Sequence, residues 1–153
     1  MPELSLGRRI GIDFGTARIG IAISSVDGLI CSPLATVTND AEAIENILKL
    51  VGENHPISIY VGLPLNLQGN RTTSTELAIE FAKNLALASS VPVRLIDERM
   101  STRAAQGQMH ASGRNTRQSR DIIDAAAASL ILESALALEK GTGKLSGNDV
   151  VEF

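Results

Sequence analysis

The start of the chain contains two apolar segments that are so close together that we expect them to pair as a hairpin. Residues 9–14 and 18–24 are both rich in isoleucine, and Gly15 begins the turn between them. A connection this short joins neighbouring antiparallel strands. A third strand is expected at 29–37, where Pro33 favours a sheet edge because proline cannot donate to a strand ladder.

The rest of the chain alternates between helix and strand patterns. A continuous apolar run at 57–63 is typical of a buried parallel strand, and a shorter strand is expected at 91–96. This order predicts an α/β fold, with a mixed five-stranded sheet, an antiparallel arrangement of the first three strands, and helices on both faces. Helices are expected from an N-cap at Asp40 to about residue 53, at 77–88, at 104–109 and at 121–139.

The bulk properties are those of a soluble globular protein. The chain has 153 residues, 44% of them hydrophobic and 20% charged. We expect a single domain over 1–140 and a disordered tail over 141–153, which has glycines near its start and no helical periodicity. No apolar stretch approaches the roughly 20 residues of a membrane span, and no apolar signal core opens the chain. These features, and a single cysteine, predict a cytoplasmic protein without a membrane partner.

Acidic residues stand at the ends of the apolar segments, where a charge is costly to place. Asp13 ends the first strand, Asp97 and Glu98 follow the fifth, and Asp121 and Asp124 share one face of the last helix. Ligands of such sheets bind at the carboxyl ends of the strands. Because gathered carboxylates repel one another unless a cation neutralises them, the pattern predicts an all-oxygen site for Mg²⁺ or Mn²⁺.

Three of these acids have a plainer explanation when each is taken alone, whereas Asp124 is harder to dismiss because it lies a turn further into the helix. Asp13 could form a turn before a glycine, Glu98 could pair with Arg99 or Arg103, and Asp121 could simply favour a helix N-terminus. Taken together, the acids favour the metal site. Zinc is disfavoured because the two histidines are isolated and the cysteine stands alone. Two magnesium-like ions at one site can activate water and stabilise the leaving oxygen of a phosphodiester.

A basic segment lies between the second and third acidic clusters. Residues 99–120 include no acid, although the net charge of the chain is −3. Such a segment suits a polyanion such as a nucleic acid, and a solvated loop is the alternative. Its arginines are Arg99, Arg103, Arg114, Arg117 and Arg120.

Four strings of the sequence resemble, in order and spacing, the YqgF family, which is also called RuvX. They are GIDFGTARIGIAIS, VGLPLNLQGN, LIDERMST and DAAAASLIL, and the resemblance covers about residues 8–138. It implies an RNase H-like fold and a nuclease. The family is connected both with the processing of pre-16S rRNA and with the resolution of Holliday junctions.

The resemblance also implies roles for particular acids. Asp13, Glu98 and Asp124 match the three acids of the family, so we expect them to be catalytic and to hold the metal. Asp121 is a fourth candidate ligand, because its spacing from Asp124 resembles the paired last-helix acids of RuvC resolvases. Asp97 is expected to be a neighbour of the site rather than a ligand.

The resemblance assigns the arginines to the substrate. Arg18 matches the RIG arginine of the family and Arg99 its DER arginine, and either could contact a phosphate or hold the acids in place. One departure is visible, since Gln68 and Asn70 occupy a loop that often carries an acid in the family. The residues expected to bind substrate are Arg18, Arg99, Arg103, Arg114, Arg117 and Arg120.

The leading hypothesis is a metal-dependent nuclease that acts on structured RNA, in the 5′ processing of precursor 16S rRNA, with ribosomal precursor particles as partners. The alternative is a Holliday junction resolvase that acts on branched DNA. The string DFGT also resembles the first phosphate loop of actin-like and Hsp70-like ATPases, but those proteins need two such domains. A noncatalytic nucleic-acid-binding or ribosome partner is a further alternative, and the three matched acids argue against it.

The basic segment generates a test. Replacing Arg114, Arg117 and Arg120 with alanine should weaken binding to nucleic acid and make the affinity less dependent on salt, because fewer counterions are released. The measurement is the affinity for a labelled stem–loop RNA over a range of salt concentrations. An unchanged affinity and slope would reduce the segment to a solvated linker.

Overall fold

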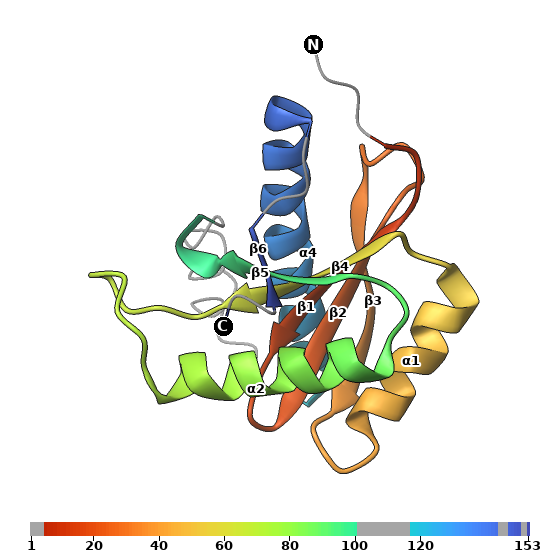
Figure 1. The fold of residues 1–153 in the computed structure, drawn as a ribbon. Helices are drawn as coiled ribbons and strands as arrows, with labels where there is room; N and C mark the ends of the chain where they lie inside the picture. The colour runs from red at the N-terminus through yellow and green to blue at the C-terminus, as the bar shows by residue number, and fades with distance from the viewer. Residues whose placement is uncertain (1–4, 101–116, 144–146, 151–152) are drawn as a thin grey trace.

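The described part of the chain, residues 5–100, 117–143, 147–150 and 153 of a computed structural model, is built around a mixed six-stranded sheet (Figure 1). Its strand order is β3-β2-β1-β4-β5-β6. The strands are β1 (Arg9–Phe14), β2 (Arg18–Ser24), β3 (Cys31–Thr38), β4 (Ser58–Leu63), β5 (Val93–Asp97) and β6 (Asn148–Asp149). The helices are α1 (Ala43–Asn54), α2 (Thr73–Ala88), the 3₁₀ helix η1 (Glu98–Met100) and α4 (Arg117–Thr142). Among the described residues, no helix is long and apolar enough to cross a membrane.

The directions of the strands bring three carboxyl ends to one edge of the sheet. β1 pairs antiparallel with β2, with Ile12 opposite Ile21, and parallel with β4, with Ile12 opposite Val61. β4 in turn pairs parallel with β5. The opening meander and the parallel strands after it are as predicted. β3 is one of the two edge strands, and its register with β2 shifts between Ile21 and Ala22, next to Pro33.

Helices cover both faces of the sheet, and the sheet separates two apolar cores (Figure 1). On one face, α1 and α2 pack over a core that includes Ile47, Phe81 and Leu85. On the other face, α4 packs through Ala128 and Leu132. Because side chains alternate along a strand, neighbouring residues of β1 point to different cores.

α4 approaches the sheet very closely, because glycines stand where it crosses. A Cβ atom added to Gly20 of β2 would lie 2.0 Å from the backbone oxygen of Asp124. One added to Gly11 of β1 would lie 2.7 Å from Cβ of Leu132. A glycine inside a strand marks such an approach of another backbone. The missing side chains therefore set the distance between α4 and the strands.

A buried ion pair fixes the far end of α4. Arg9 of β1 and Glu139 are 0% and 3% exposed, and Nη2 of Arg9 donates to Oε2 of Glu139 over 2.9 Å. The Tyr60 hydroxyl on β4 donates to the other oxygen of the same carboxylate. Breaking a buried pair on one side leaves an uncompensated charge, so the pair holds the helix to β1 and β4.

The structure differs from the sequence prediction at the end of the chain and at one cap. The predicted tail, 141–153, includes β6, which supplies a sixth strand where five were expected. Arg94 donates to the backbone of Gly147, and Val150 is buried, so the short segment gains both a ladder and core contacts. α1 begins at Ala43 rather than directly after Asp40, whose side chain accepts a hydrogen bond from the backbone of Glu42. The helix predicted at 104–109 lies outside the described residues.

The glycine contact under α4 gives a stability prediction. Gly20→Ala should destabilise the protein by about 1–3 kcal/mol, because the new methyl group meets backbone and not a flexible side chain. The matched control is Gly52→Ala in α1, where an added Cβ meets nothing within 4 Å. The control should gain about 0.5–1 kcal/mol from helix propensity. Urea denaturation measures both, and equal midpoints for Gly20→Ala and the wild type would contradict the close approach.

Candidate active site

Three acids from three separate elements lie together at the carboxyl edge of the sheet. Asp13 is near the end of β1, Glu98 opens η1 directly after β5, and Asp124 lies in the second turn of α4. The carboxyl groups of Asp13 and Glu98 share a hydrogen bond, and the charge of Asp124 acts on Asp13. The three acids predicted as catalytic are therefore neighbours in space.

Asp13 is the most perturbed of these acids. Its pKa is raised from 3.8 to about 6: burial raises it most, the hydrogen bond with Glu98 lowers it, and the negative charge of Asp124 raises it. A partly buried carboxylate beside two others lacks the solvation that would stabilise its charge. A cation at this position would relieve that cost, which is the property expected of a metal site.

Glycines that the sequence prediction did not use make room for these acids. Gly62 of β4 lies beneath Glu98, since a Cβ atom there would be 2.7 Å from Oε1 of Glu98. Gly20 of β2 likewise makes room for Asp124, because a Cβ atom there would lie 2.0 Å from the backbone oxygen of Asp124. The signal available in the sequence was a glycine inside an otherwise apolar strand. Glycine weakens a strand, so its presence there indicates that another group approaches the backbone closely.

Arg18 holds one of the acids. From the start of β2, its Nε donates to Oδ2 of Asp124 over 2.7 Å, and both side chains are partly exposed. Arg18 was expected either to contact a phosphate or to hold an acid in place, and this contact corresponds to the second role. The ion pair also balances part of the negative charge around Asp13.

Asp97 forms an ion pair with Arg99. Its Oδ1 accepts from the backbone nitrogen of Arg99 over 2.9 Å, and its Oδ2 accepts from Nη2 over 2.6 Å. Arg99 therefore pairs with Asp97, and not with Glu98 as the plainer explanation of Glu98 supposed. Asp97 occupies the position of a neighbour that orients an arginine beside the site.

The remaining predicted residues are only partly described. Asp121, Arg117 and Arg120 lie in α4, which begins at Arg117 rather than at residue 121 as expected. The description covers the backbone of these residues and not their side chains. Arg103 and Arg114 lie outside the described residues.

The donor set at this edge suits a hard divalent cation. Asp13, Glu98 and Asp124 offer only carboxylate oxygens, which Mg²⁺ and Mn²⁺ prefer. As the described side chains stand, no group of three or more His, Cys, Asp or Glu could hold a metal ion. One oxygen of Asp124 is engaged by Arg18, so the three acids would have to reorient to share a cation.

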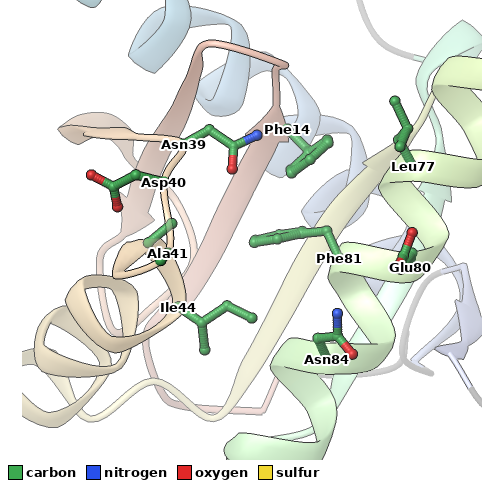
Figure 2. A pocket seen from close by; sticks show the side chains of 10 residues that line it. Phe14, Asn39, Asp40, Ala41, Ile44, Leu77, Glu80, Phe81 and Asn84 are labelled. Carbon is green, nitrogen blue, oxygen red and sulfur yellow. The ribbon is translucent and has the colours of Figure 1, made fainter.

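A pocket of about 230 Å³ lies on the other side of β1 (Figure 2). Phe14, which follows Asp13, points to this side and stacks on Phe81 of α2 with ring centroids 4.6 Å apart. The carboxylates of Asp40 and Glu80 stand at the pocket, which disfavours a phosphate there. The pocket is therefore separate from the three acids, which lie on the α4 side of the sheet.

The fold matches solved resolvase structures. RuvC of T. thermophilus, in complex with a Holliday junction substrate, aligns with a TM-score of 0.57 and 19% identity, and the match covers 92% of this chain and 99% of that one. A second Thermus thermophilus RuvC structure aligns with a TM-score of 0.52, also at 19% identity, over 88% of this chain and 97% of that one. At this identity the likeness concerns the fold, which is the RNase H-like α/β fold.

Sequence comparison identifies closer relatives. A protein of Clavibacter michiganensis named "Putative pre-16S rRNA nuclease" is 44% identical over 147 residues, which is 94% of this chain and 91% of the relative. A Streptomyces coelicolor protein of the same name is 40% identical, over 97% of this chain and 91% of its own. The family model described as RuvX, Holliday junction resolvase, matches residues 7–138. With that match over most of its length, the chain belongs to the RuvX family.

Proposed function

We propose that this chain, a nuclease by its family, is a metal-dependent hydrolase that cleaves phosphodiester bonds at the edge formed by Asp13, Glu98 and Asp124. Structured RNA is the proposed substrate, and the 5′ side of precursor 16S rRNA is its proposed site of action. The names of the relatives support the RNA assignment. The observation that carries the proposal is the convergence of two carboxyl groups, Glu98 from η1 and Asp124 from α4, on the partly buried Asp13 of β1.

The acids and arginines have distinct proposed roles. Asp13, Glu98 and Asp124 would hold Mg²⁺ or Mn²⁺, with Asp121 as a fourth ligand. Bound there, the metal supplies an activated water and stabilises the charge on the leaving oxygen. Arg18 keeps Asp124 in place until the site is assembled, and then offers its guanidinium to a phosphate.

The substrate would be held mainly through its phosphates. Arg99, oriented by Asp97, lies beside the acids, and we assign Arg103, Arg114, Arg117 and Arg120 to the same surface. Phe14 and Phe81 are occupied with each other inside the fold. Recognition would therefore use backbone charge and the shape of the nucleic acid rather than stacking on these rings.

Resolution of Holliday junctions is the second candidate function. The description of the family model favours it, and so does the fold shared with a RuvC bound to a junction. The two candidates use the same chemistry and differ in the nucleic acid. Incubating the protein with precursor 16S rRNA and with a four-way DNA junction, in Mg²⁺ or Mn²⁺, separates them. Cleavage of the junction alone would reject the RNA assignment.

Metal dependence has a test that does not need the natural substrate. The folded pKa of Asp13, about 6, lies above its ordinary value of 3.8. The stability from this group is therefore present below about pH 4 and is lost as the pH rises through 6. At pH 7 and without metal, Asp13→Asn should stabilise the protein by about 1–3 kcal/mol.

The same variant should lose activity and the response to metal. Mg²⁺ should raise the melting temperature of the wild type, since it neutralises the acids, but leave Asp13→Asn nearly unchanged. Thermal denaturation at pH 4, 6 and 7, with and without Mg²⁺, measures the stabilisation by Asp13→Asn and its loss of the response to metal. Equal residual cleavage by Asp13→Asn and by the wild type in Mg²⁺ would reject the mechanism.

The ion pair of Arg18 gives a second prediction. Because Arg18 competes with a cation for Asp124, Arg18→Ala should bind Mn²⁺ about two- to fivefold more tightly in the absence of nucleic acid. Cleavage should nevertheless slow, because Asp124 loses its support. Arg71→Ala is the control, because this substitution removes the same charge from an exposed pair with Glu76, away from the three acids. Titration followed by electron paramagnetic resonance measures the affinity, and identical binding by the Arg18 and Arg71 variants would contradict the competition.

A further inference from the structure

The loop between β4 and α2 carries an apolar side chain outward next to the candidate active site. Residues 64–72 leave the carboxyl end of β4 and extend away from the sheet before α2 begins (Figure 1). Leu67 in this loop is 81% exposed, whereas Leu65 packs against the core. Exposure of an isolated leucine is common on protein surfaces, so its significance depends on how the loop is built.

The loop is held rigidly by its own hydrogen bonds. Oδ1 of Asn66 accepts from the backbone nitrogens of Gln68 and Asn70, over 3.1 and 2.8 Å. The backbone nitrogen of Gly69 donates to the carbonyl of Asn66, and Leu65 forms an antiparallel bridge with Arg71. Such a network fixes the backbone, so that Leu67 does not need to be ordered again when it binds a partner.

The loop is also tied to the active-site edge. The guanidinium of Arg99 packs on Gly69, where an added Cβ would lie 2.9 Å from Nη1. Asp97, the last residue of β5, accepts hydrogen bonds from the same guanidinium. At the base of the loop, the Thr75 hydroxyl donates to the carbonyl of Pro64. The position of Leu67 is therefore fixed relative to Glu98, which is next in sequence to both Asp97 and Arg99.

The surroundings of Leu67 suit a polyanion better than a protein partner. No acidic residue occurs in the sequence between Glu53 and Glu76, and the loop contributes Arg71, whose guanidinium lies 3.5 Å from the exposed carboxylate of Glu76. Gln68 and Asn70 are exposed and polar, so the described residues next to Leu67 along the loop do not extend it into a broad apolar patch of the kind that protein partners cover. A single apolar side chain between polar and basic groups resembles the wedges that enter between base steps.

We propose that Leu67 is a wedge that enters the base stack of the substrate where a helix is interrupted, at a bulge or a helix end. The rigid loop would then select interrupted helices and set the distance from the interruption to the phosphodiester at the acids. This inference rests on the proposed nuclease function and adds a selectivity determinant to it.

The test compares two stem–loop RNAs that differ only in whether a 2-aminopurine nucleotide is bulged or paired. Affinity and 2-aminopurine fluorescence are measured in EDTA, so that the RNA stays intact. Leu67→Ala should bind the bulged RNA about tenfold more weakly, which is the scale of removing a buried isobutyl group. It should also lose the rise in fluorescence that accompanies unstacking, and its binding to the paired RNA should not change. The matched control is Leu87→Ala, because Leu87 is 88% exposed at the far end of α2 and should behave as wild type.

The outcomes separate this inference from the function on which it rests. If the wild type cleaves RNA in Mg²⁺ but Leu67→Ala keeps its affinity and fluorescence rise with the bulged RNA, the wedge is wrong and the nuclease remains. Equal weakening toward both RNAs would also overturn the wedge, in favour of a general contact. If the wild type binds and cleaves neither RNA, the proposed function fails first and the wedge fails with it. Melting temperatures confirm that both leucine variants are folded.

Discussion

The close passage of α4 over the glycines of the sheet is the contact on which the site depends. Asp124 can approach Asp13 only because Gly20 has no side chain at the crossing, and Glu98 lies over Gly62 for the same reason. A methyl group at Gly20 would have to displace the backbone of α4, and one at Gly62 the side chain of Glu98. Gly20 and Gly62 contribute no side-chain packing to their strands, and this allows acids from distant parts of the sequence to lie close together.

The two ends of α4 use opposite solutions for buried charge. At one end, Arg9 and Glu139 form a nearly complete pair, with the Tyr60 hydroxyl on the second oxygen, so the charge is compensated within the protein. At the other end, Arg18 compensates only part of the charge of the three acids, and Asp13 keeps a pKa of about 6. The compensated end anchors the helix, and the uncompensated end stores an unfavourable interaction that a bound cation would remove.

The sequence predicted what local patterns determine. The isoleucine-rich strands, with bounds Arg9–Phe14 and Arg18–Ser24, followed from their alternation and short turn, and the edge position of β3 followed from Pro33. The proximity of the acids was predicted from their places at segment ends. β6 could not be predicted, because two residues carry no periodicity and pair only when β5 is already in place. The pairing of Arg99 with Asp97 depends on the local turn at the end of β5, where the Asp97 carboxylate accepts from both the backbone nitrogen and the guanidinium of Arg99.

The same arrangement explains how a small site can be both fixed and selective. The acids sit on β1, η1 and α4, whose positions are set by the sheet and its cores, so their backbones are held together and only their side chains have to reorient to share a cation. Arg99 connects this frame to the loop at 64–72, since one guanidinium is held by Asp97 and packs on Gly69. If the loop selects substrate as proposed, a change in it would alter which nucleic acid is bound without moving a carboxylate. The proposed chemistry would then reside on the regular elements, and the proposed selection on the loop that they position.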